Sequence, residues 1–446
     1  MTYVFTSTPE RGSEAPQSVH ANAAAPVSLA ISLCGLAAAA LTLAFCRQSG
    51  ALRIEAALLV CMAYAGTVLA GETLLLRTPW AASAGLDFAR RGFDLARIGT
   101  KLLGLYGVFA VLACIYWLFP EYRAGMYQPT WVAAQQLLPY VLILAVPYVA
   151  CVDRAMKAPE DGLYWFGRLL LLDRDPARWP ALRQFALGWI VKGFFTPIMF
   201  HGLVQNTETL MRSSFDLGSL TFAQFYALAT VCLFWTDVMV ACVGYVFALR
   251  LFDTHIRSSE PTAFGWFICL MCYPPFQTVL MAQYFAFSAQ NAVRLLSDWP
   301  LLQMVWGVAA LALLVIYTLS TLVFGCRFSN ITHRGVIAAG PYRFTKHPAY
   351  VTKNLYWWLA HAPFIPVAGA GEALRFCILM VGINVIYYLR SKTEERHLSH
   401  DPAYVAYATA MNDKSLFAPV ARILPFLRYR SPECGTAHDG PYKGLA

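Results

Sequence analysis

Three basic side chains and three aromatic rings are concentrated in the segment GPYRFTKHPAY, residues 340–350. They are Arg343, Lys346 and His347, with Tyr342, Phe344 and Tyr350. Pro348 suits the first turn of a helix, because its missing N–H would be unpaired there anyway. A helix starting at Pro348 would present free backbone N–H groups beside these cations, and such groups bind anions. The aromatic faces could hold a heterocycle or a cation. The alternative is an ordinary basic, aromatic loop at a membrane surface.

A second polar cluster, YYLRSKTEERHLSHDPAYVAY, spans residues 387–407. Adjacent helical residues point about 100° apart, so we expect one of Glu394 and Glu395 to face a given site. The other could pair with Arg390 or Lys392. An acidic pair on a solvated helix face is the alternative. Together the two clusters offer cations for a carboxylate, carboxylates for a diol or an amine, and aromatic faces for a ring.

The two blocks resemble the signature blocks of integral-membrane methyltransferases of the isoprenylcysteine carboxyl methyltransferase and phospholipid methyltransferase type. That family carries approximately G-x-Y-x-x-x-R-H-P-x-Y, then, after one helical hairpin, E-E-x-x-L followed by Y-x-x-Y. The resemblance covers roughly residues 301–425. Lys346 replaces the family's arginine, which turns a planar bidentate contact into a point charge, and Thr352 replaces a common glycine. The matching residues are Gly340, Tyr342, His347, Pro348 and Tyr350, then Glu394, Glu395, Leu398, Tyr404 and Tyr407.

The resemblance implies methyl transfer from S-adenosylmethionine to a membrane-embedded lipidic acceptor with a carboxyl or amine group. Alignment of donor and acceptor and exclusion of water would be the main tasks of the protein. A carboxylate acceptor needs no base, whereas an amine would need one such as Glu394. By the resemblance, the cofactor would be held by Tyr342, His347, Pro348, Tyr350, Glu395, Tyr404 and Tyr407, and the catalytic candidates are Arg343, Lys346 and Glu394.

Two other functions stay open at this point. Sterol reductases that use NADPH have about ten spans and a similarly placed C-terminal nucleotide site, and the segment 420–430 resembles the end of those enzymes. A non-enzymatic transporter or structural membrane protein is the third possibility. Lys192 and Asp237 lie inside apolar segments, where charges are expensive and mark functional positions. We expect them to pair with each other and to line a substrate-binding tunnel.

These residues need a membrane scaffold to position them. The 446-residue chain is 58% hydrophobic and 13% charged, about half the charged fraction of a soluble domain. The sequence therefore predicts an all-α polytopic membrane protein. With about 20 apolar residues per span, we expect ten spans. They lie near residues 27–46, 54–75, 100–119, 131–152, 182–204, 224–250, 263–288, 301–325, 350–368 and 371–390.

Two of these spans are irregular. Pro274 and Pro275 should break or kink the seventh, since proline removes backbone donors. Pro363 and Pro366 make the ninth a kinked helix or a tight hairpin. With the N-terminus inside, most of the 34 lysines and arginines fall on cytoplasmic segments. That orientation places both termini and the cofactor site in the cytoplasm. The net charge of +9 then reflects loops facing anionic lipid rather than nucleic acid.

The domain organisation follows from these spans. Residues 1–25 are expected to be a flexible tail, 26–290 a transmembrane region of unassigned role, 301–425 the methyltransferase-like domain, and 426–446 a C-terminal tail. The insert at 159–180 reads as an amphipathic interfacial helix, with a plain loop as the alternative. The cysteines, including the pair Cys269 and Cys272, are expected to be free thiols in apolar packing, and no metal is expected. The oligomeric state is not readable from the sequence.

Overall fold

A computed structural model describes residues 27–431 of the chain, apart from 91, 214–217, 278–290 and 368. The described part is almost entirely helical, with one two-stranded antiparallel pair, β1 (Ser258–Ser259) and β2 (Thr332–His333). Eight of its helices are long and apolar enough to cross a membrane. The predicted all-α polytopic class is confirmed. The described residues supply eight such helices, where the sequence predicts ten.

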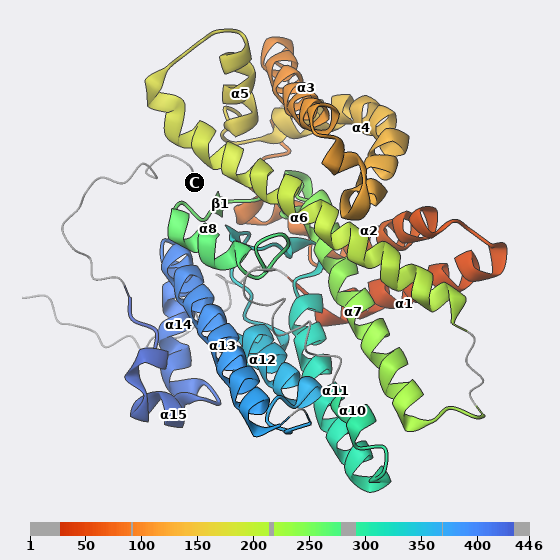
Figure 1. The fold of residues 1–446 in the computed structure, drawn as a ribbon. Coiled ribbons are helices and arrows are strands. Elements are labelled where there is room, and N and C mark those ends of the chain that lie inside the picture. The colour runs from red at the N-terminus through yellow and green to blue at the C-terminus, as the bar shows by residue number, and fades with distance from the viewer. Residues whose placement is uncertain (1–26, 91, 214–217, 278–290, 368, 432–446) are drawn as a thin grey trace, which may run out of the picture.

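The N-terminal part of the fold packs its helices around a core of large apolar side chains. Tyr64, Val68, Leu203 and Met239 meet at its centre, and all four are buried. Figure 1 shows the long helix α6 crossing this half, with α3, α4 and α5 on one side of it. The helices are α1 (Leu29–Ser49), α2 (Arg53–Leu75), α3 (Leu95–Leu118), α4 (Gln128–Ala155), α5 (Gly162–Leu170), α6 (Trp179–Arg212) and α7 (Phe222–Val246).

The insert after α4 forms the nine-residue helix α5, which packs closely on α3. Gly104 and Gly167 permit this approach. A Cβ on Gly167 would lie 2.0 Å from the carbonyl oxygen of Thr100, and one on Gly104 would lie 2.3 Å from that of Leu163. A helix is therefore present where the sequence predicts one. Its position relative to a lipid surface stays a prediction.

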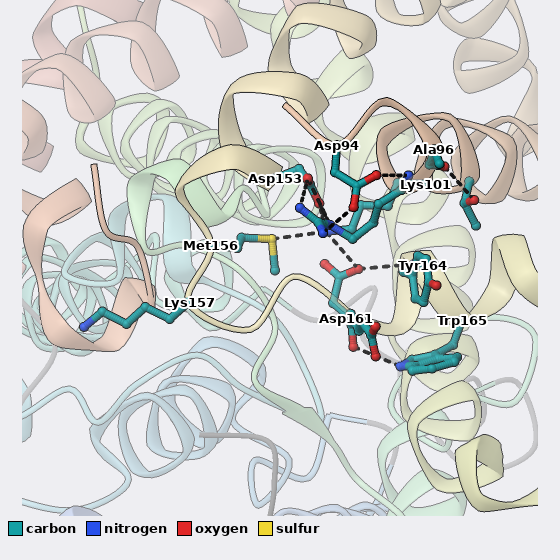
Figure 2. Close-up of polar contacts among 12 residues, drawn as sticks. Asp94, Ala96, Lys101, Asp153, Met156, Lys157, Asp161, Tyr164 and Trp165 are labelled. Carbon is teal, nitrogen blue, oxygen red and sulfur yellow. Dashed lines mark hydrogen bonds and ion pairs between the residues drawn. The ribbon is translucent and has the colours of Figure 1, made fainter. Parts of the chain in front are cut away.

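A buried ion cluster ties α3, α4 and the start of α5 together (Figure 2). Asp153 of α4 receives the guanidinium of Arg97 at 2.8 Å and the ammonium of Lys101 at 2.9 Å. Lys101 also lies 3.6 Å from Asp161, whose carboxylate caps the N-terminus of α5. The side chains of Asp153 and Lys101 are almost completely shielded from solvent. The cluster therefore fixes the insert at one edge of the N-terminal half.

The C-terminal part contains the helical hairpin and the helices that follow it. Figure 1 shows α11, α12 and α13 on the opposite side of α6 from α3 and α4, with α14 and α15 beside them. The helices are α8 (Ala263–Leu270), α10 (Ala292–Leu295), α11 (Pro300–Leu322), α12 (Pro348–His361), α13 (Ala370–Leu398), α14 (Pro402–Lys414) and α15 (Ala418–Ile423).

The two irregular spans differ from full crossings in different ways. The described part of the seventh is the eight-residue helix α8, followed by turns through Pro274 and Pro275, and residues 278–290 lie outside the described part. The ninth is α12, which has 14 residues and ends at His361. Ala362 adopts a left-handed conformation there, and Pro363 cannot continue the helix. The described cysteines are free, and Cys269 and Cys272 are buried, as predicted.

Buried polar contacts join the two halves. Arg327, just after α11, pairs with Glu72 of α2 at 2.8 Å, and both side chains are fully buried. Arg334 donates to the carbonyl oxygens of Gly244 and Phe328, at 2.7 and 2.9 Å. Both arginines thus have partners among the N-terminal helices, Arg327 in α2 and Arg334 in α7. The two halves therefore form one packed unit.

Candidate functional site

The segment that leads into α12 is shaped by two backbone features. Gly340 has a φ of +57°, a conformation that glycine adopts without strain, and it begins a short 3-10 turn over Gly340–Arg343. The helix then starts at Pro348, with His347 as its N-cap residue. The predicted helix start is therefore confirmed. Lys346 and His347 consequently lie at the N-terminal end of α12, where the helix dipole is positive.

Glu395 of α13 contacts two lysines and a histidine at this point. Its carboxylate lies 2.7 Å from the Lys346 ammonium, 3.2 Å from Nε2 of His347 and 2.8 Å from the ammonium of Lys392. The Glu395 side chain is 6% exposed, so these contacts replace the water that a carboxylate would otherwise bind. Glu395 thus holds Lys346 and His347 in place against the end of α13.

Glu394 has a different environment from its neighbour. The Tyr350 hydroxyl donates a hydrogen bond to Glu394 at 2.7 Å, and the His347 ring stacks on the Tyr350 ring with centroids 5.6 Å apart. Glu394 is only partly buried and lines the one of two neighbouring cavities that has the larger total empty space, open mouth included. Glu395 lines the smaller one instead. As the sequence predicts, Glu394 and Glu395 face different surroundings, and the latter pairs with Lys392.

The larger cavity encloses about 1340 Å³ with its open mouth included. Its walls combine aromatic rings with charged and hydroxyl groups, a composition typical of cofactor sites. The Tyr404 hydroxyl is buried there and has no hydrogen-bond partner among the described residues, whereas the Tyr407 hydroxyl donates to the carbonyl oxygen of Tyr342. The sequence-predicted residues among its lining are Tyr342, Lys346, His347, Tyr350, Glu394, Tyr404 and Tyr407.

Burial sets the electrostatics of the loop residues. It lowers the pKa of Lys346 from its ordinary value of 10.5, and the neighbouring Glu395 opposes that shift. Burial also raises the pKa of Tyr342, so its hydroxyl stays neutral. A hydrogen bond from His333, which lines the cavity, lowers the pKa of Asp401, the residue that caps α14. Burial therefore makes the protonated form of Lys346 less favourable than it is in water.

The remaining sequence candidates lie elsewhere. Pro348 is buried in the first turn of α12 and positions that turn. Arg343 is exposed and lines neither cavity. Thr352, in place of the family's glycine, turns its hydroxyl back to the carbonyl of Pro348 at 2.8 Å. The structure therefore brings seven of the candidates together at the larger cavity, whereas Glu395, Pro348 and Arg343 do not line it.

The predicted pairing of Lys192 with Asp237 is wrong. The Lys192 ammonium lies 4.6 Å from the centre of the Trp189 ring on its own helix. Asp237 accepts a hydrogen bond from the hydroxyl of Tyr317 at 2.7 Å. The reason is that α7 directs Asp237 toward α11, so each charge has a different partner. Their role in binding a substrate stays a prediction.

The cavity also contains polar residues that motif reasoning did not assign to the site. Arg390 lies 5.2 Å from the Tyr350 ring centre, 5.6 Å from Tyr273 and 5.8 Å from Tyr387, and it donates to Asn330. In the sequence, the feature that points to Arg390 is its position one helical turn before Glu394. Tyr317 and Lys353 line the same cavity. Asp237 of α7 holds Tyr317, which in turn accepts a hydrogen bond from Lys353. Because Asp237 is remote in the sequence, no local sequence pattern indicates this arrangement.

Comparison with known proteins identifies part of the chain. Residues 301–400 match the model of the isoprenylcysteine carboxyl methyltransferase (ICMT) family. The C-terminal third carries an ICMT-family segment. No curated protein and no solved structure matches the chain. The ICMT match includes Lys346, Glu394 and Glu395, and it ends before Tyr404 and Tyr407. It supports a membrane methyltransferase in general.

The residues around the cavity suit the cofactor that the ICMT family implies. S-adenosylmethionine combines a carboxylate, ribose hydroxyls, a sulfonium and an adenine ring. Lys346 offers a cation, Glu394 offers acceptor oxygens for hydroxyls, and several tyrosines offer aromatic faces. The unpartnered hydroxyl of Tyr404 is a further observation in favour, because a buried hydroxyl without a partner costs free energy unless a ligand satisfies it.

Proposed function

We propose that this protein is an S-adenosylmethionine-dependent methyltransferase whose acceptor is a lipid or lipid-linked molecule in the membrane. The proposal rests on the different surroundings of Glu394 and Glu395. Glu395 holds Lys346 and His347 at the start of α12, while Glu394 and Tyr350 border the larger cavity. This arrangement lies within the ICMT-family segment.

In this proposal the chain's own residues bind and orient the reactants. Lys346 and the first turn of α12 meet the cofactor's carboxylate. Glu394 accepts hydrogen bonds from the ribose hydroxyls, and the rings of Tyr342, Tyr404 and Tyr407 surround the adenine. The cofactor supplies a methyl group that its sulfonium already activates. The surrounding helices exclude water, which leaves alignment as the main catalytic contribution.

Access for the acceptor follows from the position of the cavity beside membrane-crossing helices. The cavity is bordered by α11, α12 and α13, and α11 and α13 are among the eight candidate spans. An acceptor with an apolar chain can therefore reach the site from the bilayer, while the charged groups at the end of α13 meet a water-soluble cofactor. Both termini and the cofactor end of the cavity are proposed to face the cytoplasm, as the basic loops indicate.

The test is label transfer in detergent. Purified protein is incubated with methyl-labelled S-adenosylmethionine and a lipid extract of its host, and the products are separated by chromatography and mass spectrometry. We expect a labelled lipid that is 14 mass units heavier than its precursor. A matched incubation measures NADPH oxidation against a panel of sterols and enones. NADPH oxidation without any labelled lipid would contradict the methyltransferase and favour a reductase.

A further inference from the structure

A series of hydrogen-bonded polar side chains begins in the lining of the larger cavity, one turn along α12 from Tyr350. The Lys353 ammonium donates a hydrogen bond to the Tyr317 hydroxyl at 3.3 Å, and that hydroxyl donates to Asp237 at 2.7 Å. Lys353 belongs to α12, Tyr317 to α11 and Asp237 to α7. Lys353 and Tyr317 line the cavity. Asp237 lies behind them, about sixty residues before the start of the ICMT-family match.

The Lys353 ammonium has N–H groups that are available to a ligand. An ammonium group has three donors, and among the described residues Tyr317 accepts one of them. Two aromatic rings also lie beside it, with the ammonium 4.9 Å from the Tyr317 ring centre and 5.3 Å from that of Trp357. These rings stabilise a cation without using its N–H groups. Lys353 can therefore bind an anionic group in the cavity.

Asp237 supplies the opposite charge from behind. Tyr317 stands between Asp237 and Lys353, and within the described residues no direct ion pair joins the two charges. The second carboxylate oxygen of Asp237 is buried and has no hydrogen-bond partner there. If Lys353 only neutralised the charge of Asp237, its ammonium would contact the carboxylate directly, because direct pairing best offsets the cost of desolvation. The inserted tyrosine instead leaves the ammonium at the cavity wall.

We propose that Lys353 binds the anionic head of the methyl acceptor, and that Asp237 positions Lys353 through Tyr317. This inference rests on the proposed function. It assigns the N-terminal half a part in the site, because Asp237 comes from outside the ICMT-family segment. The acceptor is then an apolar molecule with a terminal oxygen anion. Asp237 is a positioning residue, whereas Lys353 touches the substrate.

The charges balance in this arrangement. A lone pair of the acceptor's anionic oxygen forms the new O–CH₃ bond, the S–CH₃ bond breaks, and its electron pair stays on sulfur. The sulfonium becomes a neutral thioether and the oxygen anion becomes a neutral ester or ether, so no proton moves. Lys353 then faces an uncharged product. The loss of that attraction favours product release into the bilayer.

The first experiment compares two probes of equal chain length, dodecanoate and dodecanamide, by thermal stabilisation of the purified protein in a non-ionic detergent. We expect dodecanoate to bind the wild type more tightly than dodecanamide. Lys353→Met should abolish that preference, and Lys353→Arg should retain part of it. Lys157→Met, which removes an exposed lysine at the end of α4, is the matched control and should leave the preference unchanged.

The second experiment separates positioning from folding. In Asp237→Asn and Tyr317→Phe, affinity for S-adenosylmethionine by calorimetry should stay at the wild-type value. The KM for the lipid that becomes labelled in the extract assay should rise by about 10- to 150-fold, the range for loss of a hydrogen bond to a charged group, with a smaller change in kcat. Unchanged acceptor KM in Lys353→Met, or an unchanged dodecanoate preference in Asp237→Asn, would overturn the inference. A wild type that fails to bind S-adenosylmethionine would instead overturn the proposed function.

Discussion

The two adjacent glutamates at the end of α13 have unequal roles because a helix turns neighbouring side chains in different directions. Glu395 is buried against Lys346, His347 and Lys392, so its charge stabilises the start of α12. Glu394 has Tyr350 as its partner and borders the larger cavity. One supports the site and the other is available to a ligand. Substitution of each by glutamine should separate these roles.

Glu395→Gln should destabilise the protein. Removing the carboxylate leaves Lys346, His347 and Lys392 without their shared anion, and breaking a buried ion pair costs about 3–5 kcal/mol. Glu394→Gln should leave the melting temperature within a few degrees of wild type while weakening cofactor binding. Thermal unfolding in detergent, followed by tryptophan fluorescence, measures the first effect. Equal melting temperatures for the two variants would show that Glu395 does not support the fold.

The pH dependence of cofactor binding should report on Lys346. Burial lowers the pKa of this lysine, so as the pH rises it loses its proton, and its attraction for a carboxylate, below the usual 10.5. An arginine stays protonated throughout that range. In Lys346→Arg, affinity for S-adenosylmethionine should persist to higher pH than in the wild type. Calorimetry from pH 7 to pH 10 measures this, and identical profiles would exclude Lys346 from carboxylate binding.

At the scale of the elements, the contact between α3 and α5 depends on two glycines. Gly167→Val should disrupt this contact, because a side chain there would collide with the Thr100 carbonyl. We expect faster proteolysis within residues 156–178, measured by limited digestion and mass spectrometry. Gly99→Ala on α3, where an added Cβ meets nothing within 4 Å, is the control. Equal digestion rates for Gly167→Val and wild type would mean that α5 is not held by this contact.

The sequence predicts elements where local chemistry decides them. Pro348 marks the start of α12 because proline is tolerated in a first helical turn, and the Glu394-Glu395 pair follows one hairpin later. The seventh and ninth spans are less predictable. Their apolar composition suggests full crossings, whereas α8 ends at Leu270 and α12 ends at His361, before Pro363. Hydropathy measures composition over a window and cannot locate a chain reversal inside it.

Contacts between remote charges could not be predicted at all. Lys192 and Asp237 are conspicuous in apolar segments, yet their partners are Trp189 and Tyr317. The choice depends on which helix face meets which neighbour, and that is a property of tertiary packing. The Glu72–Arg327 pair joins residues 255 positions apart. No spacing rule connects them.

At the scale of the whole molecule, Glu72 and Arg327 hold the N-terminal helices to the ICMT-family segment. Glu72→Gln should lower stability by about 3–5 kcal/mol, because it leaves the buried Arg327 charge without this partner. The double variant Glu72→Leu with Arg327→Met should recover most of the loss, since well-packed apolar residues often replace a buried pair without cost. Thermal unfolding in detergent measures both. A double variant that is no more stable than Glu72→Gln would show that the pair is not coupled.

The proposed function requires that the cavity beside Glu394 binds S-adenosylmethionine. Isothermal titration calorimetry of the full-length protein in detergent tests it most directly, with Glu394→Gln as the site variant. Glu372→Gln, at the other end of α13 and paired with Arg375, is the control. We expect one binding site in the wild type and in Glu372→Gln, and affinity reduced about tenfold or more in Glu394→Gln. No binding to the wild type, or equal affinity in all three proteins, would contradict it.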